Sequence, residues 1–128
     1  MEQKSISSVK DLEVYSQSYS LAVDIFRFSL SFPKEELYSL TDQIRRSSRS
    51  ISANISEGYA KRHHESLFKH HLIIALGSLA ETQTWLEFAR DFSYIPVDKF
   101  DEFSKRYDIL GAKLYRLLRN WRTIRTGK

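Results

Sequence analysis

Apolar residues recur along this chain in steps of three and four, the spacing that places side chains on one face of an α-helix. The longest such run lies near the end of the chain and follows the two core positions of a heptad repeat: Phe100, Phe103, Tyr107, Leu110, Leu114, Leu117, Trp121 and Ile124. An uninterrupted heptad seam is typical of helical bundles and coiled coils. It predicts a helix over about residues 96–123.

The same spacing predicts three earlier helices, over about residues 9–31, 40–62 and 65–91. Pro33 ends the first of them, because a proline disfavours helical geometry in the residue before it. Pro96 suits the first turn of the last helix. Four amphipathic helices with short connections fold most simply as an up-down-up-down bundle. We therefore predict an all-α four-helix bundle that occupies residues 1–128 as a single domain.

The predicted helix over residues 9–31 has more apolar surface than one small core can cover. Its aromatic residues Tyr15, Tyr19, Phe26 and Phe28 are divided between two stripes and cannot all face the same neighbours. We therefore expect the chain to form a homo-oligomer in which part of this surface is covered by other copies.

The predicted helix over residues 40–62 has the opposite character, because its apolar stripe is thin. Small residues, among them Ser47, Ser48 and Ser52, lie between its isoleucines and would let a neighbouring backbone approach closely. Gly58 lies near the end of this helix, where a glycine commonly marks a C-terminal turn.

The composition fits a globular protein rather than a disordered, secreted or membrane-spanning one. Apolar residues make up 41% of the 128 residues and aromatic residues 13%, so there is ample surface to bury. Cysteine is absent, which excludes disulfides, thiolate metal sites and a cysteine nucleophile. The first residues lack the apolar segment of a signal peptide, and no apolar run is long enough to span a bilayer. We expect a cytoplasmic protein with no membrane association.

The formal net charge of +4 is concentrated at the end of the chain, since residues 104–128 carry a net charge of +7. In the heptad register of the last helix, several cations fall on positions that point away from the core. These candidate nucleic-acid-binding residues are Lys105, Arg116, Arg119 and Arg122, with Arg125 beyond them. Flexible cations on an exposed face are what phosphate contacts require; a solvated surface is the alternative interpretation.

A second basic surface is predicted on the helix over residues 40–62 and just after it. Arg45 and Arg49 lie four residues apart, and Lys61 and Arg62 follow at the end of the same helix. These four residues are further candidates for nucleic-acid contact, again with a solvated face as the alternative.

Polar residues on this helix also form a stripe, with spacings of three and four. The stripe comprises Gln43, Arg46, Ser50, Asn54 and Glu57, and Glu81 of the next helix is a candidate partner. We favour a structural network, within the bundle or between subunits, because buried charges must be paired. The alternative is a surface for a ligand or a nucleic acid.

No motif predicts catalysis or a bound metal. The serines stand in no nucleophile-elbow sequence, and the chain has neither a phosphate-binding loop nor a dinucleotide-binding glycine pattern. The histidines lack the spacing of a zinc site, and His71, within an apolar stripe, is expected to be a hydrogen-bonded packing residue. We therefore expect a protein that is not an enzyme and has no cofactor or metal.

Three segments carry a resemblance to a known family. Residues 40–46 read LTDQIRR, residues 50–58 read SISANISEG and residues 77–81 read GSLAE. This combination closely resembles the four-helix-bundle proteins encoded in intervening sequences of bacterial 23S ribosomal RNA genes, and the similarity covers nearly the whole chain. Ser47 and Ser56 stand where alanine is common in that pattern, and both changes exchange one small residue for another.

The resemblance implies an up-down-up-down bundle that assembles into a ring-like homopentamer. It also implies kinship with the accessory protein of diversity-generating retroelements, a basic pentamer that binds nucleic acid and reverse transcriptase. We therefore hypothesise a non-enzymatic homo-oligomer that binds RNA or DNA through basic surface residues. A scaffold for a protein partner, with no role in nucleic-acid binding, is the alternative hypothesis.

Overall fold

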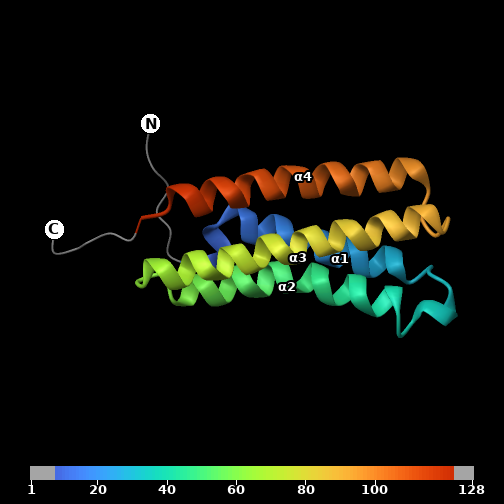
Figure 1. The fold of residues 1–128 in the computed structure, drawn as a ribbon, viewed down its shortest axis with the longest axis horizontal. Helices are drawn as coiled ribbons and strands as arrows, with labels where there is room; N and C mark the ends of the chain where they lie inside the picture. Colours follow the sequence, from blue (N-terminus) through green and yellow to red (C-terminus); the bar gives the residue numbers. More distant parts are fainter. Residues whose placement is uncertain (1–7, 123–128) are drawn as a thin grey trace.

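The computed structural model describes residues 8–122, and its helices confirm the predicted all-α bundle. Consecutive helices run in opposite directions along the long axis, as an up-down-up-down bundle (Figure 1). The elements are the 3₁₀ turn η1 (Val9–Asp11), α1 (Glu13–Ser29), the 3₁₀ turn η2 (Lys34–Glu36), α2 (Leu40–Ala60), α3 (Glu65–Asp91) and α4 (Val97–Asn120).

The two largest differences between the observed helix ends and the sequence expectation have identifiable backbone reasons, and α1 and α2 each also end two residues earlier than predicted. The α1 helix begins at Glu13, because Leu12 is extended (φ −83°, ψ 122°) and the residues before it form η1. The α4 helix ends at Asn120, because Trp121 has an extended ψ of 135°. Trp121 still packs on the core, edge-on against Phe68 of α3 with 4.7 Å between the ring centroids.

The core follows the seams that the sequence marks. On α4, Phe103, Tyr107, Leu110 and Leu114 are fully buried. The thin apolar stripe of α2 is also fully buried, and its members are Ile44, Ile51 and Ile55. Large side chains from α1, α3 and α4 complete one continuous cluster.

The most extensive contact between two helices of the bundle is that of α2 with α3, where small residues line the seam. Gly58 lies inside α2, so the expected C-terminal turn at this position is wrong. A Cβ atom on Gly58 would lie 2.7 Å from the Cβ of His71 and 3.0 Å from Cδ1 of Phe68, both on α3. Further along the seam, Thr82 donates a hydrogen bond to the Ser47 hydroxyl (2.8 Å). Small side chains therefore let the two backbones pack closely.

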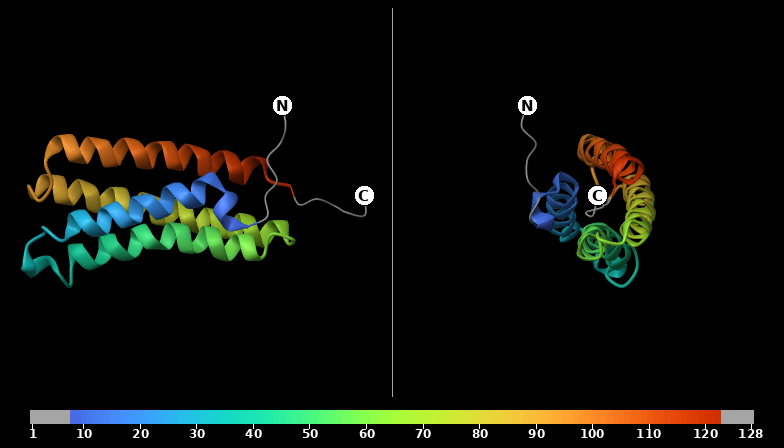
Figure 2. Two further views of the ribbon diagram at one scale, coloured as in Figure 1. Left: turned by 180° about the vertical axis from the view of Figure 1, so that it is seen from behind. Right: turned by 90° about the vertical axis from the view of Figure 1, so that its left-hand side faces the viewer.

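The opposite side of the bundle, between α1 and α4, is the most loosely packed. These two helices contact each other less than any other pair of neighbouring helices. The end-on view in Figure 2 shows α1 standing apart from α4, with α3 at the right between α4 above and α2 below. Two ion pairs bridge the looser side, Arg106 to Asp24 (2.9 Å) and Lys113 to Glu13 (2.8 Å).

The two connections at the right-hand end of Figure 1 are joined by a hydrogen bond to a carboxylate. Glu36 accepts a hydrogen bond from the Tyr94 hydroxyl (2.8 Å) and another from the backbone N–H of Leu40 at the start of α2 (3.2 Å). The Tyr94 hydrogen bond, followed by that of Leu40, lowers the pKa of Glu36. The same bond raises the pKa of the Tyr94 phenol.

Replacement of Gly58 by alanine is expected to destabilise the protein by about 1–3 kcal/mol, the usual range for overpacking, because the new methyl group clashes with α3. Gly77→Ala is the matched control. Gly77 is exposed within α3 and a Cβ there meets nothing within 4 Å, so alanine should stabilise the helix by about 0.5–1 kcal/mol. Urea unfolding of both variants measures the two effects. If both substitutions raised the free energy of unfolding by the same amount, the close approach of α2 to α3 would be contradicted.

Tyr94→Phe should lower stability at neutral pH but not in acid. A carboxylate whose pKa is lower in the folded state stabilises the fold above its unfolded pKa of about 4.5, and this stabilisation is lost as the pH falls through the folded pKa. The stability difference between wild type and variant should therefore shrink on acidification. Tyr38→Phe is the control. Tyr38 lies in the connection between α1 and α2 that also carries Glu36, and it is 92% exposed, so the effect of this substitution on stability should not depend on pH. Denaturant midpoints across the acid range test this, and a pH-independent difference would refute it.

Candidate functional site

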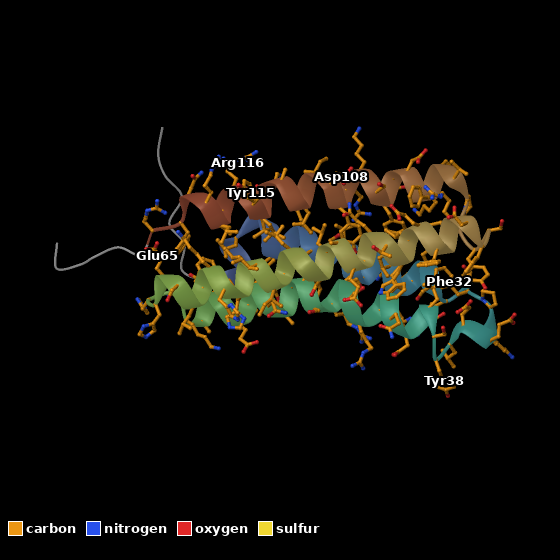
Figure 3. The ribbon with its side chains drawn as sticks, in the orientation of Figure 1. Phe32, Tyr38, Glu65, Asp108, Tyr115 and Arg116 are labelled. Atoms are coloured by element: carbon orange, nitrogen blue, oxygen red, sulfur yellow. The ribbon has the colours of Figure 1, made fainter. Side chains whose placement is uncertain are left out.

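The bundle gathers cations at one end, where α2 and α4 terminate. Lys61 and Arg62 follow the last turn of α2, and Arg116, Arg119 and Arg122 lie in and just after the last turns of α4. We call these five residues the basic end. It is the left-hand end of the molecule in Figure 1, and Figure 3 shows Arg116 projecting from α4 there.

The three α4 arginines of the basic end are exposed and have no carboxylate partner among the side chains that the structure describes. Arg116 makes no hydrogen bond or ion pair with any of these described side chains. The guanidinium of Arg119 lies 5.7 Å from the centroid of the Tyr115 ring. Arg122 donates to the carbonyl oxygens of Arg119 (3.3 Å) and Trp121 (2.8 Å). Their positive charge is therefore not neutralised locally.

The side chains of Lys61 and Arg62, the two residues of the basic end that follow α2, are more constrained. Lys61 lies 3.4 Å from a Glu57 carboxylate oxygen and 3.2 Å from Nε2 of His71. Arg62 stacks on the Tyr59 ring at 4.1 Å and donates to the Tyr59 carbonyl oxygen (3.1 Å). Both add positive potential at this end while being held by their neighbours.

The other predicted cations lie elsewhere. Lys105 is exposed on α4 without a partner in the described structure, about 16 Å along the helix from Arg116. Arg45 packs against α1, since its Nε donates to the Ser29 hydroxyl (2.7 Å) and its guanidinium lies 4.5 Å above the Phe26 ring. Arg49 donates from Nε to the Arg45 carbonyl oxygen (3.0 Å). Arg125 falls outside the described residues.

The opposite end of the bundle is acidic. The connections and helix starts there carry Glu35, Glu36, Asp42, Asp91, Asp98, Asp101 and Glu102. Both α2 and α4 start at the acidic end and finish at the basic end, so the charges match the dipoles of these two helices, while α1 and α3 run in the opposite direction. The molecule is therefore electrically polarised along its long axis, and the basic end is the surface suited to an anionic partner.

The polar stripe of α2 divides into two parts. In the first, the side chain of Asn54 donates to the carbonyl and hydroxyl oxygens of Ser50 (2.9 and 3.1 Å), and its Oδ1 lies 3.2 Å from Nδ1 of His71. The His71 Nδ1–H must then be the donor, which leaves Nε2 to accept from Lys61. His71 is buried and hydrogen-bonded, as expected from its place in an apolar stripe.

The second part of the stripe lines a polar groove between α2 and α3. Gln43, Arg46, Arg49 and Ser50 come from α2, and Ser78 and Glu81 come from α3. The groove has a volume of about 580 Å³. Glu81 accepts a hydrogen bond from the indole N–H of Trp85 (3.2 Å) and makes no ion pair with Arg46.

Comparison with known proteins places the chain in a family. A profile of the 23S rRNA-intervening sequence protein family matches residues 10–116. The chain belongs to this family. A crystal structure of a protein of unknown function from the S23 ribosomal protein family of Bacteroides thetaiotaomicron is similar, with a TM-score of 0.77 and 27% sequence identity over 84% of this chain and 96% of that one. No curated protein matches the chain.

In this member of the 23S rRNA-intervening sequence protein family, the segments that carry the resemblance face each other. Residues 40–46 and 50–58 lie in α2 and residues 77–81 in α3, and together they supply much of the α2–α3 seam and the polar groove. Ser47 accepts the Thr82 hydrogen bond across that seam. Its hydroxyl group is thus accommodated by a partner on α3.

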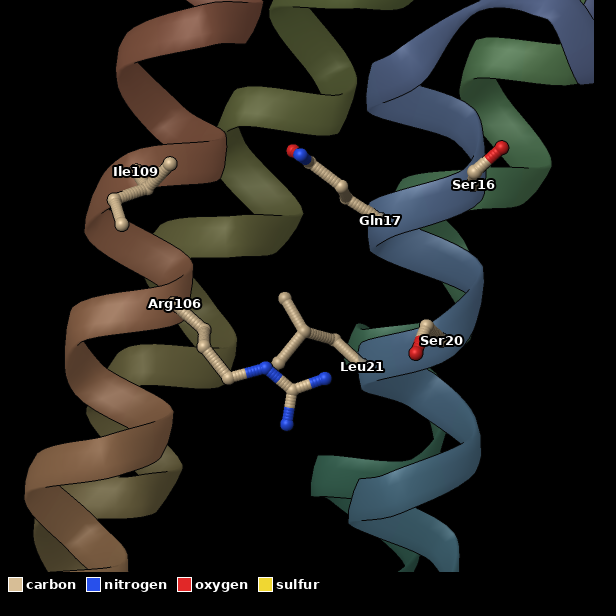
Figure 4. A pocket seen from close by; sticks show the side chains of 6 residues that line it. All are labelled: Ser16, Gln17, Ser20, Leu21, Arg106 and Ile109. Carbon is tan, nitrogen blue, oxygen red and sulfur yellow. The ribbon is translucent and has the colours of Figure 1, made fainter.

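Apolar hollows on this family member lie along α1. One, of about 300 Å³, opens between α1 and α4 and is lined by Gln17, Leu21, Arg106 and Ile109, with Ser16 and Ser20 at its edge (Figure 4). A second, of about 280 Å³, lies beside Tyr19 and Phe26, which are 56% and 45% exposed. Tyr15 and Phe28 pack partly against the core. The aromatic surface of α1 is therefore only partly buried within the bundle.

Two negative findings concern residues 8–122 alone. No helix within this part of the chain is long and apolar enough to cross a membrane. Nor do three or more His, Asp or Glu side chains gather there in a way that could hold a metal ion.

Proposed function

We propose that this protein is a homo-oligomer, pentameric as the family resemblance implies, that binds the phosphate backbone of RNA or DNA through its basic end. The observation that carries the proposal is the cluster of Arg116, Arg119 and Arg122, which are exposed and unpaired with carboxylates in the described structure. Phosphate contacts of this kind supply affinity without reading base sequence. The role is one of binding, without a catalytic step.

Oligomerisation is supported by the aromatic surface of α1. Tyr19 and Phe26 border an apolar hollow and remain about half exposed in one subunit. Large apolar residues gathered beside a concave surface are typical of interaction sites. In an oligomer, each subunit contributes a basic end, and several weak phosphate contacts on one strand combine into strong binding.

Charge reversal in Arg116→Glu/Arg119→Glu should weaken binding of structured RNA or DNA at least tenfold and reduce the steepness of its salt dependence by roughly 1–2 units of slope. The control is Arg27→Glu/Lys34→Glu, which makes the same change in charge on exposed residues near the acidic end. Filter binding across a range of salt concentrations measures both effects.

Equal losses in the two double variants would indicate a general charge effect and contradict binding at the basic end. If wild-type protein binds no nucleic acid at low salt, the proposal fails. Recovery from cells of a defined protein partner that resists nuclease and high salt would then favour the protein-interaction scaffold.

Light scattering at micromolar concentration should give a mass near five times the 15.1 kDa of the chain. Tyr19→Ser/Phe26→Ser should shift this mass toward that of the monomer, because it removes the aromatic groups proposed to be covered by another subunit. Tyr38→Ser, which changes an exposed tyrosine away from α1, is the control and should leave the mass unchanged. A wild-type mass equal to that of one chain would refute oligomerisation.

A further inference from the structure

The polar groove between α2 and α3 is the largest of the hollows described above, at about 580 Å³, and the basic end does not include it. Clefts of about 300–1,000 Å³ are typical of small-molecule sites. Arg46 in the groove lies about 22 Å along α2 from Lys61 of the basic end. The groove is therefore a separate place on the molecule, on the side of the bundle rather than at its end.

One side of the groove presents hydrogen-bond donors with no acceptor. Arg46 is exposed and makes no hydrogen bond or ion pair within residues 8–122. The Nε–H of Arg49 is used by the Arg45 carbonyl, whereas its terminal nitrogens have no partner in the described structure. Two guanidinium groups one helical turn apart are suited to a phosphate group.

The hydroxyl groups of Ser50 and Ser78 add one more donor to this side. They lie 2.9 Å apart, and either oxygen can be the donor of the bond between them. The pair has two hydroxyl hydrogens and forms one bond, while the Asn54 amide donates to Ser50 rather than accepting from it. Whichever arrangement holds, one O–H remains for a further acceptor at the groove.

The remaining side of the groove presents an acceptor. One oxygen of Glu81 accepts from the Trp85 indole (3.2 Å), and the other oxygen has no donor among the described residues. A carboxylate repels a simple anion, so inorganic phosphate alone does not match the groove. The matching ligand combines an anionic group for Arg46 and Arg49 with hydrogen-bond donors for Glu81.

We propose that the groove binds a single nucleotide, with its phosphate on Arg46 and Arg49 and its base donating to Glu81. Guanine fits this acceptor best, because its N1–H and amino group lie side by side and can donate together to one carboxylate. The nucleotide comes either free or from an unstacked position in a strand, the form in which RNA-binding proteins read base edges. Binding of a free nucleotide does not depend on the proposed role of the basic end.

Titration calorimetry on the full-length protein tests the proposal with guanosine monophosphate, uridine monophosphate, guanosine and inorganic phosphate. Guanosine monophosphate should bind about tenfold more tightly than the other three ligands, a factor within the range of discrimination that a bidentate base contact supplies. Trp85 lies next to the groove through its bond to Glu81, so its fluorescence should change on binding.

Arg46→Gln and Glu81→Gln should each weaken binding of guanosine monophosphate about tenfold or more, and thermal unfolding confirms that each variant folds. Arg27→Gln, which changes an exposed arginine outside both the groove and the basic end, is the control and should leave this binding unchanged. A second titration, with a short single-stranded RNA that contains guanine, shows whether the ligand is a free nucleotide or an unstacked nucleotide within a strand. Binding of the free nucleotide, or of the strand alone with the same dependence on Arg46 and Glu81, supports the proposal.

Three results would overturn the proposal. The first is that neither the nucleotide nor the strand binds in a manner that depends on Arg46. The second is dependence on Arg46 without dependence on Glu81, which would leave a phosphate contact alone. The third is a change in oligomer mass in Arg46→Gln without any effect on ligand, which would assign the groove to a subunit interface. Failure of the proposed function would be seen in a different experiment. In that case the Arg116→Glu/Arg119→Glu variant would bind the strand as tightly as the wild type does.

Discussion

The close approach of α2 to α3 is the constraint on which the rest of the bundle depends. At Gly58 the two helices leave no room for even one additional carbon atom, since a Cβ there would lie 2.7 Å from the Cβ of His71. The apolar stripe of α2 is thin and entirely buried, and its members Ile44, Ile51 and Ile55 are aliphatic rather than aromatic. The fully buried aromatic residues Phe68, Phe103 and Tyr107 come from α3 and α4, whereas Tyr19 and Phe26 of α1 remain about half exposed.

The same seam explains why polar chemistry collects on one side of the molecule. Where two helices pack through serine, threonine and glycine, hydroxyl groups replace large apolar side chains between them and must find partners. Thr82 and Ser47 satisfy each other in this way, and Ser50 and Ser78 do so nearer the surface. At the surface, short side chains leave a hollow between the longer ones, and the polar groove lies there. Tight packing and the open groove thus have one origin.

The fold could be predicted from the sequence because helical periodicity records which side chains are buried. The α4 seam through Phe103, Tyr107 and Leu110 is buried as its heptad spacing requires. The role of Gly58 could not be predicted, because a glycine near a helix end has the same sequence signature as a C-terminal turn. Periodicity also assigns faces within one helix but not the distances between helices. It therefore could not show that Arg45 packs on α1 or that Lys61 joins Arg116 at one end.

The polarity of the bundle links its topology to the proposed binding role. Cations at the ends of α2 and α4 are favoured by the helix dipoles, so local stability alone accounts for some positive charge there. The helix dipoles do not account for how the positive charge is distributed, since Arg106 and Lys113 are paired across to α1 whereas Arg116 has no carboxylate partner among the described side chains. In a cyclic oligomer whose axis runs along the bundles, every basic end would face the same side. The positive potential of several subunits would then combine on one surface, which is the arrangement that an extended polyanion binds most strongly.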